Sequence, residues 1–241
     1  MSVFLIVEDD ALHRAFLREV ISLADISCTE LIEADDGDEA VQLAKRHAVK
    51  GVVMDLQMPK KTGVQAARAI WAHDPSLPIL FWSNYADEAY VRGITKIVPS
   101  SATYGYLLKT SSKERLRRSM QCVFLEGQNI IDREIRDVQQ RGADHREGLT
   151  DAEYEALLDI AIGLTDQAIA NRRAISLRSV QGRLQQLYSK LGVADAPPVD
   201  GHSAIYNSRT RTIAAALTRR LINSKSIEMA EQEYLKWTSS T

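Results

Sequence analysis

Acidic residues follow two short apolar runs in the first half of the chain, and a lysine follows a third. Glu8 and Asp9 come after VFLIV, and Asp55 comes after GVVM. Lys109 comes after YLL. If these runs are parallel strands, their ends meet at one edge of a sheet, so the side chains should converge. Two carboxylates about 4 Å apart repel by roughly 4 kcal/mol at an effective dielectric of about 20, and a divalent cation relieves that repulsion. Oxygen-only ligation favours Mg²⁺.

Asp55 is the candidate nucleophile of this group. A carboxylate can attack phosphorus, while a metal ion and a lysine neutralise the charge that develops on the phosphoryl oxygens. A phosphatase that uses an aspartate nucleophile is a weaker hypothesis, because such enzymes carry a second carboxylate two residues later and Gln57 stands there. These residues therefore permit phosphoryl transfer to Asp55, and we do not expect an enzyme.

The elements that must position these residues alternate along the first 125 residues. Apolar, β-branched runs such as VFLIV, GVVM and PILFW are typical of strands covered on both faces, and amphipathic stretches separate them. The pattern predicts a doubly wound α/β domain with a five-stranded parallel sheet over residues 1–125. Ser111 and Glu114 match a capping box, which predicts a helix start at Ser111.

The second half has a different periodicity. Apolar content drops over 126–148, which predicts a linker, and beyond it strand signals vanish. Helical spacing at 152–162, 166–172 and 177–191 predicts a small all-α domain over 149–193. A helical extension is expected over 194–241, after the spacer ADAPPVDGH. Its stripe of Ile213, Leu217 and Leu221 is expected to pack on the preceding helix.

Composition limits the classes of partner. The 241 residues are 45% hydrophobic with a net charge of −2, so two domains can each bury a core and any nucleic-acid contact must come from a local basic patch. Apolar runs stay shorter than the ~18 residues of a membrane span, and MSVFLIVEDD turns acidic early. We expect a cytoplasmic protein without membrane contact. Cys28 and Cys122 lie among apolar neighbours, so we interpret them as packing residues.

Residues 1 to about 125 resemble the receiver domains of two-component response regulators. The resemblance rests on VEDD, MDLQMPKKTG, FWSN and GYLLK, four motifs in the right order at predicted strand ends. It implies a flavodoxin-like fold, a cognate sensor histidine kinase as partner, and Asp55 as the phosphoacceptor. It also implies a Mg²⁺ ion held by Glu8, Asp9, Asp55 and the backbone carbonyl of Gln57.

The same resemblance assigns three further residues. Ser83 would hydrogen-bond the phosphoryl group, Lys109 would pair with it, and Tyr106 would change rotamer on phosphorylation. Two features depart from the family pattern. Thr110 follows Lys109 where receivers usually have a proline in a cis peptide, and the stretch between Ser83 and Lys109 is a few residues longer than usual.

Residues 149–193 resemble the LuxR/NarL-type helix-turn-helix output domain. Matching positions include Leu149-Thr150, Ile175-Ser176 and the run KLGV at 190–193. Ser176 can cap the recognition helix, whose N-terminal end then faces the major groove. The resemblance implies a transcription regulator that binds promoter DNA, and we expect a homodimer because one recognition helix covers too few bases for operator-level specificity. The predicted DNA-contacting residues are Arg178, Ser179, Gln181, Gly182 and Arg183.

The output module also departs from the family pattern. Asp166 stands where asparagine is usual, Arg173 where a core leucine is common, and Gly182 costs about 1 kcal/mol of helix propensity relative to alanine. These departures keep an alternative open, in which the receiver controls a protein-interaction module with weak or no DNA binding.

Overall fold

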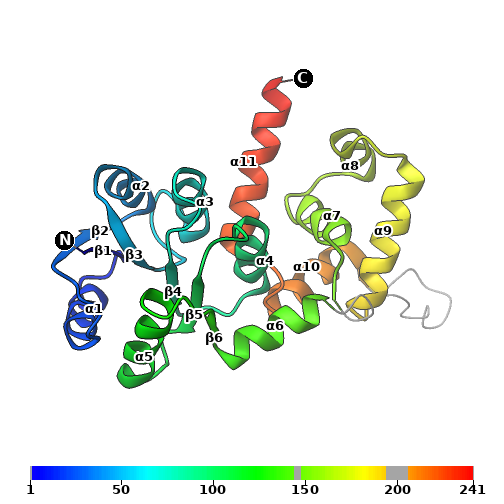
Figure 1. Cartoon of the computed structure of the whole chain (residues 1–241). Helices are drawn as coiled ribbons and strands as arrows, with labels where there is room; N and C mark the ends of the chain where they lie inside the picture. The colour runs from blue at the N-terminus through cyan, green and yellow to red at the C-terminus, as the bar shows by residue number, and fades with distance from the viewer. Residues whose placement is uncertain (1, 144–147, 194–205, 241) are drawn as a thin grey trace. The chain divides into compact units, whose positions relative to one another are not determined.

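The computed structural model describes residues 2–143, 148–193 and 206–240, and the chain folds as two compact units (Figure 1). The N-terminal unit extends to Asp137, and the C-terminal unit comprises the residues from Val138 onward together with residues 87–89. The spacer expected at 194–202 lies outside the described residues. Among those described, no helix combines the length and apolar character that a membrane crossing needs.

A parallel sheet forms the centre of the N-terminal unit, with strand order β2-β1-β3-β4-β5-β6. The strands are β1 (Val3–Val7), β2 (Glu30–Ala34), β3 (Val49–Met54), β4 (Ile79–Ser83), β5 (Tyr104–Leu108) and β6 (Ile130–Ile131). The predicted fold class is confirmed, but the predicted count of five strands is wrong. The sixth strand is two residues long and lies in the segment expected as linker, where it forms no apolar run that sequence patterns could detect.

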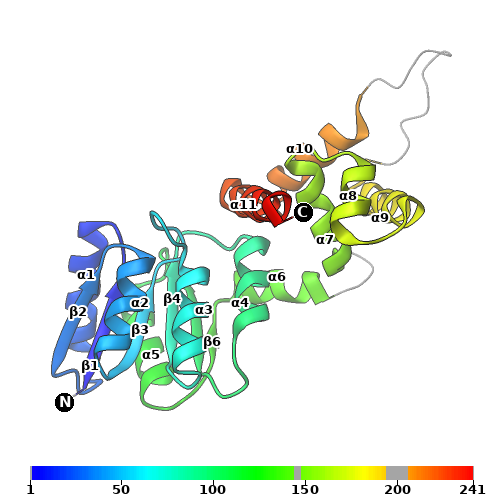
Figure 2. The ribbon, with the colours of Figure 1, turned by 90° about the horizontal axis from the view of Figure 1, so that it is seen from above.

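Helices cover both faces of this sheet (Figure 2). They are α1 (Ala11–Leu23), α2 (Gly37–Arg46), α3 (Gly63–His73), α4 (Glu88–Ile97) and α5 (Lys113–Phe124). α1 and α5 pack together on one face, and α2 and α3 pack together on the other (Figures 1 and 2). The start of α5 lies one residue later than predicted. Ser112, not Ser111, is the N-cap and accepts a hydrogen bond from the backbone N–H of Arg115.

Caps and one glycine fix the loops that follow the strands. Asp10 caps α1, Asp36 caps α2, and Thr62 caps α3 in a capping box. A Cβ atom added to Gly63 would lie 2.1 Å from the backbone oxygen of Asp55. Only glycine lets α3 begin this close to the end of β3, because any side chain would collide with the backbone at Asp55.

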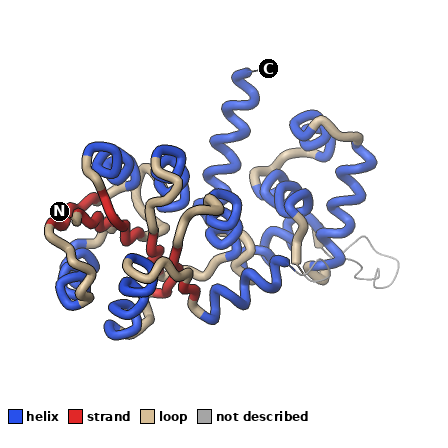
Figure 3. The backbone as a smooth tube through the Cα atoms, viewed as in Figure 1, coloured by secondary structure: helices blue, strands red, loops and turns tan. Residues whose placement is uncertain are grey.

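All described elements wholly within the C-terminal unit are helices (Figure 3). α6 (Arg133–Ala143) spans the boundary between the units. The others are α7 (Asp151–Ala161), α8 (Asp166–Arg173), α9 (Leu177–Lys190), α10 (Ser208–Thr218) and α11 (Ser224–Ser240). α9 packs on α7 and α8, and α10 and α11 contact α7. The sequence pattern indicated α10 but gave no separate signal for α11.

The turn between α8 and α9 has the expected local structure. Ala174 ends α8 in the left-handed conformation, with φ 51°, and Ser176 caps α9 by accepting a hydrogen bond from Ser179 N–H. The predicted interior residues lie in the core of this unit: Ile169, Ala170, Val180, Leu184 and Leu187 are buried, and Ile175 is partly buried.

The predicted stripe, of which Ile213 and Leu217 lie on α10 and Leu221 follows its end at Thr218, only partly faces the core. Ile213 and Leu221 pack against it, whereas Leu217 is 44% exposed. Ala216 and Ile222, neither of which belongs to the predicted stripe, are buried there instead.

Candidate functional site

The three predicted carboxylates converge at one edge of the sheet. Oxygens of Glu8, Asp9 and Asp55 all lie within 4.8 Å of one another. The ends of β1 and β3 are held together by the hydrogen bond from Asp55 N–H to Val7 O, 2.8 Å long. Glu8 and Asp55 are buried and Asp9 is exposed. Two desolvated carboxylates beside a third, solvent-facing one form an oxygen-only donor set of the kind that suits Mg²⁺.

Lys109 reaches this cluster from the end of β5. Its Nζ lies 2.7 Å from Glu8 Oε2 and 3.1 Å from Asp55 Oδ2, and its side chain is only 5% exposed. The backbone N–H of Lys109 donates to Ser83 O at 2.8 Å, which joins the ends of β4 and β5. The ammonium group contacts two of the three clustered carboxylates, Glu8 and Asp55, so carboxylates outnumber the lysine in this cluster.

The protonation behaviour of Glu8 reflects that excess. Burial raises the pKa of Glu8, and the nearby charge of Asp55 raises it further, against the opposing effect of Lys109. An ionised Glu8 is therefore costly in the protein alone. A divalent cation beside Glu8 would lower this cost.

Asp55 is oriented by its own loop. Its Oδ1 accepts hydrogen bonds from Leu56 N–H at 2.6 Å and Gln57 N–H at 3.4 Å. Its Oδ2 accepts from Lys109 Nζ. The backbone of Gln57 thus lies beside the carboxylate, while the metal-binding role expected for its carbonyl stays a prediction.

Ser83 ends β4 as expected, and Tyr106 lies in the middle of β5. Ser83 Oγ is fully buried and has no hydrogen-bond partner among the described residues. A buried hydroxyl without a partner is unfavourable, so this one is suited to a group that arrives later, such as a phosphoryl oxygen. Tyr106 is 1% exposed, and its hydroxyl donates to Tyr85 O at 2.6 Å. The ring is therefore already inside the unit.

Two aromatic neighbours of Lys109 were not predicted from the sequence. His13 Nδ1 lies 3.2 Å from Lys109 Nζ and 3.4 Å from Glu8 Oε1. The ring of Trp82 lies 5.1 Å from Lys109 Nζ and packs edge-on against His13. His13 lies one helical turn after the cap Asp10, and Trp82 directly precedes Ser83. These positions next to predicted site residues are the sequence features from which both neighbours could have been predicted.

The loop after Lys109 is anchored without proline. The described residues contain no cis peptide bond, so the Lys109–Thr110 bond is trans. Asp132, which follows β6, accepts hydrogen bonds from Leu108 N–H at 2.8 Å and Ser111 Oγ at 2.9 Å. Its other carboxylate oxygen accepts from Arg115 Nε at 2.8 Å. We call this contact the Asp132 clasp.

The predicted nucleic-acid interface lies on the first two turns of α9. Its two arginines, Arg178 and Arg183, have no ion-pair partner among the residues that the structure describes, and Arg178 is exposed. A Cβ atom on Gly182 would meet nothing within 4 Å, so packing in this unit does not require glycine there. The exposed positions are Arg178, Ser179, Gln181 and Gly182, and Arg183 is partly exposed.

Other arginines of this unit are committed to structure. Asp159 on α7 is fully buried and binds Arg172 Nη1 at 2.8 Å and Arg173 Nε at 2.9 Å. Arg173 also pairs with Glu155, and Arg209 on α10 pairs with Asp166. The two charged departures from the family pattern, Arg173 and Asp166, thus each have an ionic partner.

Comparison with known proteins gives matches over most of the chain. The family model of the response regulator receiver domain matches residues 4–121. The transcriptional regulatory protein YdfI of Bacillus subtilis is 31% identical over 229 residues, which cover 92% of this chain and 98% of that protein. The probable transcriptional regulatory protein NarL of Mycobacterium tuberculosis is 28% identical, with coverage of 92% and 96%.

A solved structure supports the fold. RcsB from Salmonella enterica serovar Typhimurium, bound to promoter P1flhDC, covers 89% of this chain and 98% of its own, with a TM-score of 0.59 and 16% identity. At that identity the likeness concerns the architecture alone.

Proposed function

The chain belongs to the response regulators of two-component systems with a NarL-type helix-turn-helix output, and from this we propose that phosphorylation of Asp55 controls its binding to promoter DNA. The observation that carries the proposal is the cluster around Asp55. A buried carboxylate with a lysine at 3.1 Å lies among excess negative charge, and the nearby Ser83 hydroxyl lacks a partner. Such a group of residues is poorly satisfied until a cation and a phosphoryl group arrive.

In the proposed reaction, an Asp55 carboxylate oxygen supplies the electron pair of a new O–P bond. The P–N bond of the kinase phosphohistidine breaks, and its electron pair returns to the imidazole nitrogen. Lys109 balances charge on the phosphoryl oxygens from its position 3.1 Å from Asp55. Leu56 N–H holds Asp55 Oδ1, so the carboxylate is fixed before the donor arrives.

The residues present fit a Mg²⁺ ion, which would be held by Glu8, Asp9 and Asp55, with Gln57 O as a further proposed ligand. When bound, the ion supplies charge neutralisation at the transferring phosphoryl group. The protein itself shields one side of the site from solvent, where the carboxylates of Glu8 and Asp55 are buried.

We propose that Ser83 and Tyr106 carry the signal away from the site. Ser83 gains its missing hydrogen bond from the phosphoryl group, and the contact of Tyr106 with Tyr85 O holds the loop after β4 in the matching conformation. Shifting an equilibrium from 1:99 to 99:1 takes about 5.5 kcal/mol, which a few charge-assisted hydrogen bonds can provide.

For the output, we propose a two-fold dimer that reads a pseudo-palindromic site, since one recognition helix covers too few bases for operator-level specificity. Arg178, Ser179, Gln181, Gly182 and Arg183 are the proposed DNA contacts. A sensor histidine kinase is the proposed phosphoryl donor. Because the DNA target is chromosomal in this proposal, we place the protein in the cytoplasm.

Labelling with a small acyl phosphate donor tests the phosphoacceptor. Wild-type protein should gain one acid-stable, base-labile phosphoryl group in the presence of Mg²⁺, and a chelator should prevent this. Asp55→Asn should abolish the label, whereas Asp35→Asn, at an exposed acid after β2, should keep it. Equal label in Asp55→Asn would overturn the assignment.

Selection of bound fragments from a random promoter library tests the output. Phosphorylated protein should retain a defined set of sequences, and Asp55→Asn protein should retain far fewer. Lys225→Ala on α11 is the matched control, because it removes a positive charge from the C-terminal unit away from α9. If no DNA is retained in either state, the protein-interaction alternative takes the place of this proposal.

A further inference from the structure

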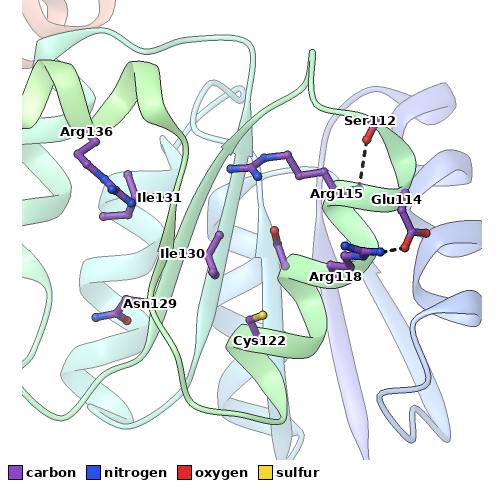
Figure 4. Close-up of a pocket in the computed structure, with 10 residues that line it drawn as sticks. Ser112, Glu114, Arg115, Arg118, Cys122, Asn129, Ile130, Ile131 and Arg136 are labelled. Carbon is purple, nitrogen blue, oxygen red and sulfur yellow. Dashed lines mark hydrogen bonds and ion pairs between the residues drawn. The ribbon is translucent and has the colours of Figure 1, made fainter.

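A hollow of about 470 Å³ lies between α5 and the segment that carries β6 and the first turn of α6 (Figure 4). Cys122, Ile130 and Ile131 contribute apolar atoms to its lining, and Arg115, Arg118 and Arg136 contribute guanidinium groups. The lining shares no residue with the Asp55 cluster. Its volume lies in the range of about 300 to 1,000 Å³ that is typical of small-molecule sites.

Positive charge predominates in this hollow. Glu114 is the only carboxylate among the described lining residues, against the three arginines. The guanidinium groups of Arg117 and Arg118 lower the pKa of Glu114 to about 2, so Glu114 is ionised and offsets one charge. Arg136 has no ion pair or side-chain hydrogen bond among the described residues. The lining residues therefore carry a net charge of +2, of which Asp132, bound to Arg115 from outside the lining, offsets one, and Arg136 keeps an uncommitted guanidinium group.

We propose that this hollow binds a small organic phosphate, a compact apolar or aromatic body bearing a phosphate monoester. The planar fork of an arginine matches the oxygens of a phosphate and can form paired hydrogen bonds with them. The side chains of Cys122, Ile130 and Ile131 give the body of the ligand an apolar surface. Arg136, from α6, and Arg118, from α5, lie on the two elements that border the hollow (Figure 4).

The site is connected to the phosphorylation site through the Asp132 clasp. Arg115 lines the hollow and binds Asp132, which in turn holds Leu108 N–H and Ser111 Oγ on the two sides of Lys109. An anion that draws Arg115 away from Asp132 loosens this clasp. On the premise that Asp55 is the phosphoacceptor, the ligand then acts on the loop that carries Lys109.

The two cysteines provide a readout located in the hollow. Cys122 lines it, whereas Cys28 lies outside it, and burial raises the pKa of both thiols. Full-length protein without Mg²⁺ is alkylated in the presence of phenyl phosphate, and the two modified peptides are quantified by mass spectrometry. Phenyl phosphate should slow alkylation of Cys122 several-fold and leave Cys28 unchanged. Phenol at the same concentration should protect neither residue.

Charge variants separate binding in the hollow from general effects. Arg118→Gln and Arg136→Gln should each weaken the protection of Cys122 by roughly tenfold in phenyl phosphate concentration. Glu114→Gln should strengthen it, because this removes the opposing charge. Arg68→Gln, at an exposed arginine on α3, is the matched control and should behave as wild type.

The outcomes that overturn the inference are specific. They are the absence of Cys122 protection, equal protection of Cys28, equal protection by phenol, or equal protection in wild type and both arginine variants. Binding does not depend on the proposed function, so Asp55→Asn protein should bind phenyl phosphate as wild type does. A failure of Asp55 labelling with Cys122 protection intact would remove the proposed function and leave the binding site standing.

Discussion

The two units each contain a buried group of opposite charges, and the two groups are balanced differently. Around Asp55, three carboxylates face one lysine, and a buried hydroxyl at Ser83 lacks a partner. Around Asp159, one fully buried carboxylate accepts three hydrogen bonds from two arginines. Both groups contain a buried aspartate, but only the first has charge and hydrogen-bonding capacity left over.

Under the proposed function, this difference separates a ligand site from a structural one. A closed network is complete without any further group, and its main effect is to fix the packing of α8 on α7. An open cluster costs free energy until a ligand arrives, and that cost is what makes ligand binding change the protein. Burial of an acidic residue alone would not have distinguished Asp55 from Asp159.

The largest expected effect comes from the same substitution made in both groups. Asp159→Asn removes the buried anion that two guanidinium groups share and leaves Arg173 only its more exposed partner Glu155, and breaking such a buried pair costs about 3 to 5 kcal/mol. Asp55→Asn removes one of several repelling carboxylates and should leave stability unchanged or raised. Urea unfolding of the full chain, with hydrogen exchange to assign each transition to its unit, measures both. Equal losses would contradict the comparison.

Magnesium ions should act on one group only. At a Mg²⁺ concentration of about 100 times its dissociation constant, the N-terminal unit should gain about 2.7 kcal/mol of stability. The exchange rates of α7 and α9 amides should not change. Glu8→Gln should greatly reduce the gain, and the control is K⁺ at matched ionic strength. Stabilisation by Mg²⁺ that persists in both Glu8→Gln and Asp55→Asn would place the ion elsewhere.

The family, the fold class and the convergence of the acidic residues followed from the sequence, because they depend on local patterns. Apolar runs in the sequence indicate buried strands, and the carboxyl ends of parallel strands lie at one edge of the sheet. Glu8, Asp55 and Lys109 each directly follow such a run, so their convergence could be predicted. Ser176 was predictable as a cap for the same reason. The N-cap of α5 was predicted one residue early, because Ser111 and Ser112 are adjacent serines and either hydroxyl could cap the helix. In the fold, Ser111 donates its hydroxyl to Asp132 and Ser112 is the cap.

Contacts between distant elements could not be predicted. From the sequence, Arg173 is a charged residue at a position where a core leucine is common, and its ion pair with Asp159, 14 residues earlier, is visible only in the fold. Asp166 is matched by Arg209, 43 residues later. The two-residue strand β6 and the Asp132 clasp likewise have no periodic signal. Each depends on which elements tertiary packing brings together, and a single sequence does not encode that in any local window.

A smaller effect, on DNA binding, should distinguish Arg178 and Arg183 of α9 from arginines that bind other residues of the protein. Arg178→Ala should cost about 1 to 3 kcal/mol of discrimination at one base position per half-site if Arg178 reads a base edge. If Arg183 contacts phosphate, Arg183→Ala should weaken all sequences alike and flatten the salt dependence by about one unit of slope. Fluorescence anisotropy on phosphorylated protein measures both.

Arg219 provides the control for these two variants. Its guanidinium binds the backbone oxygen of Leu191 at 3.1 Å, at the end of α9. Arg219→Ala should therefore lower stability without changing the salt slope. If all three variants keep wild-type affinity, slope and specificity, α9 is not the DNA-binding element.

The smallest effect concerns one glutamate from each unit, whose pKa shifts have opposite signs. Burial and the charge of Asp55 raise the pKa of Glu8. In Glu153, burial acts in the same upward direction, but the ion pair with Lys190 at 2.8 Å and the backbone N–H of Thr150 hold the pKa below its usual value. Ionised Glu8 therefore destabilises the folded protein, and ionised Glu153 stabilises it.

Substitution by glutamine should show these signs as a function of pH. Near neutral pH without Mg²⁺, Glu153→Gln should lower stability by about 1 kcal/mol, because glutamine keeps a hydrogen-bonding oxygen in this largely buried contact but loses the charge. That difference should be full above the ordinary glutamate pKa and vanish as pH falls through the lowered pKa of the folded state. Glu8→Gln should raise stability near neutral pH. Its gain should fade once pH drops below the raised pKa of Glu8 and disappear below the ordinary value, because the wild-type side chain is then neutral too. Urea midpoints of the three proteins across this pH range test the contrast, and two differences of the same sign would refute it.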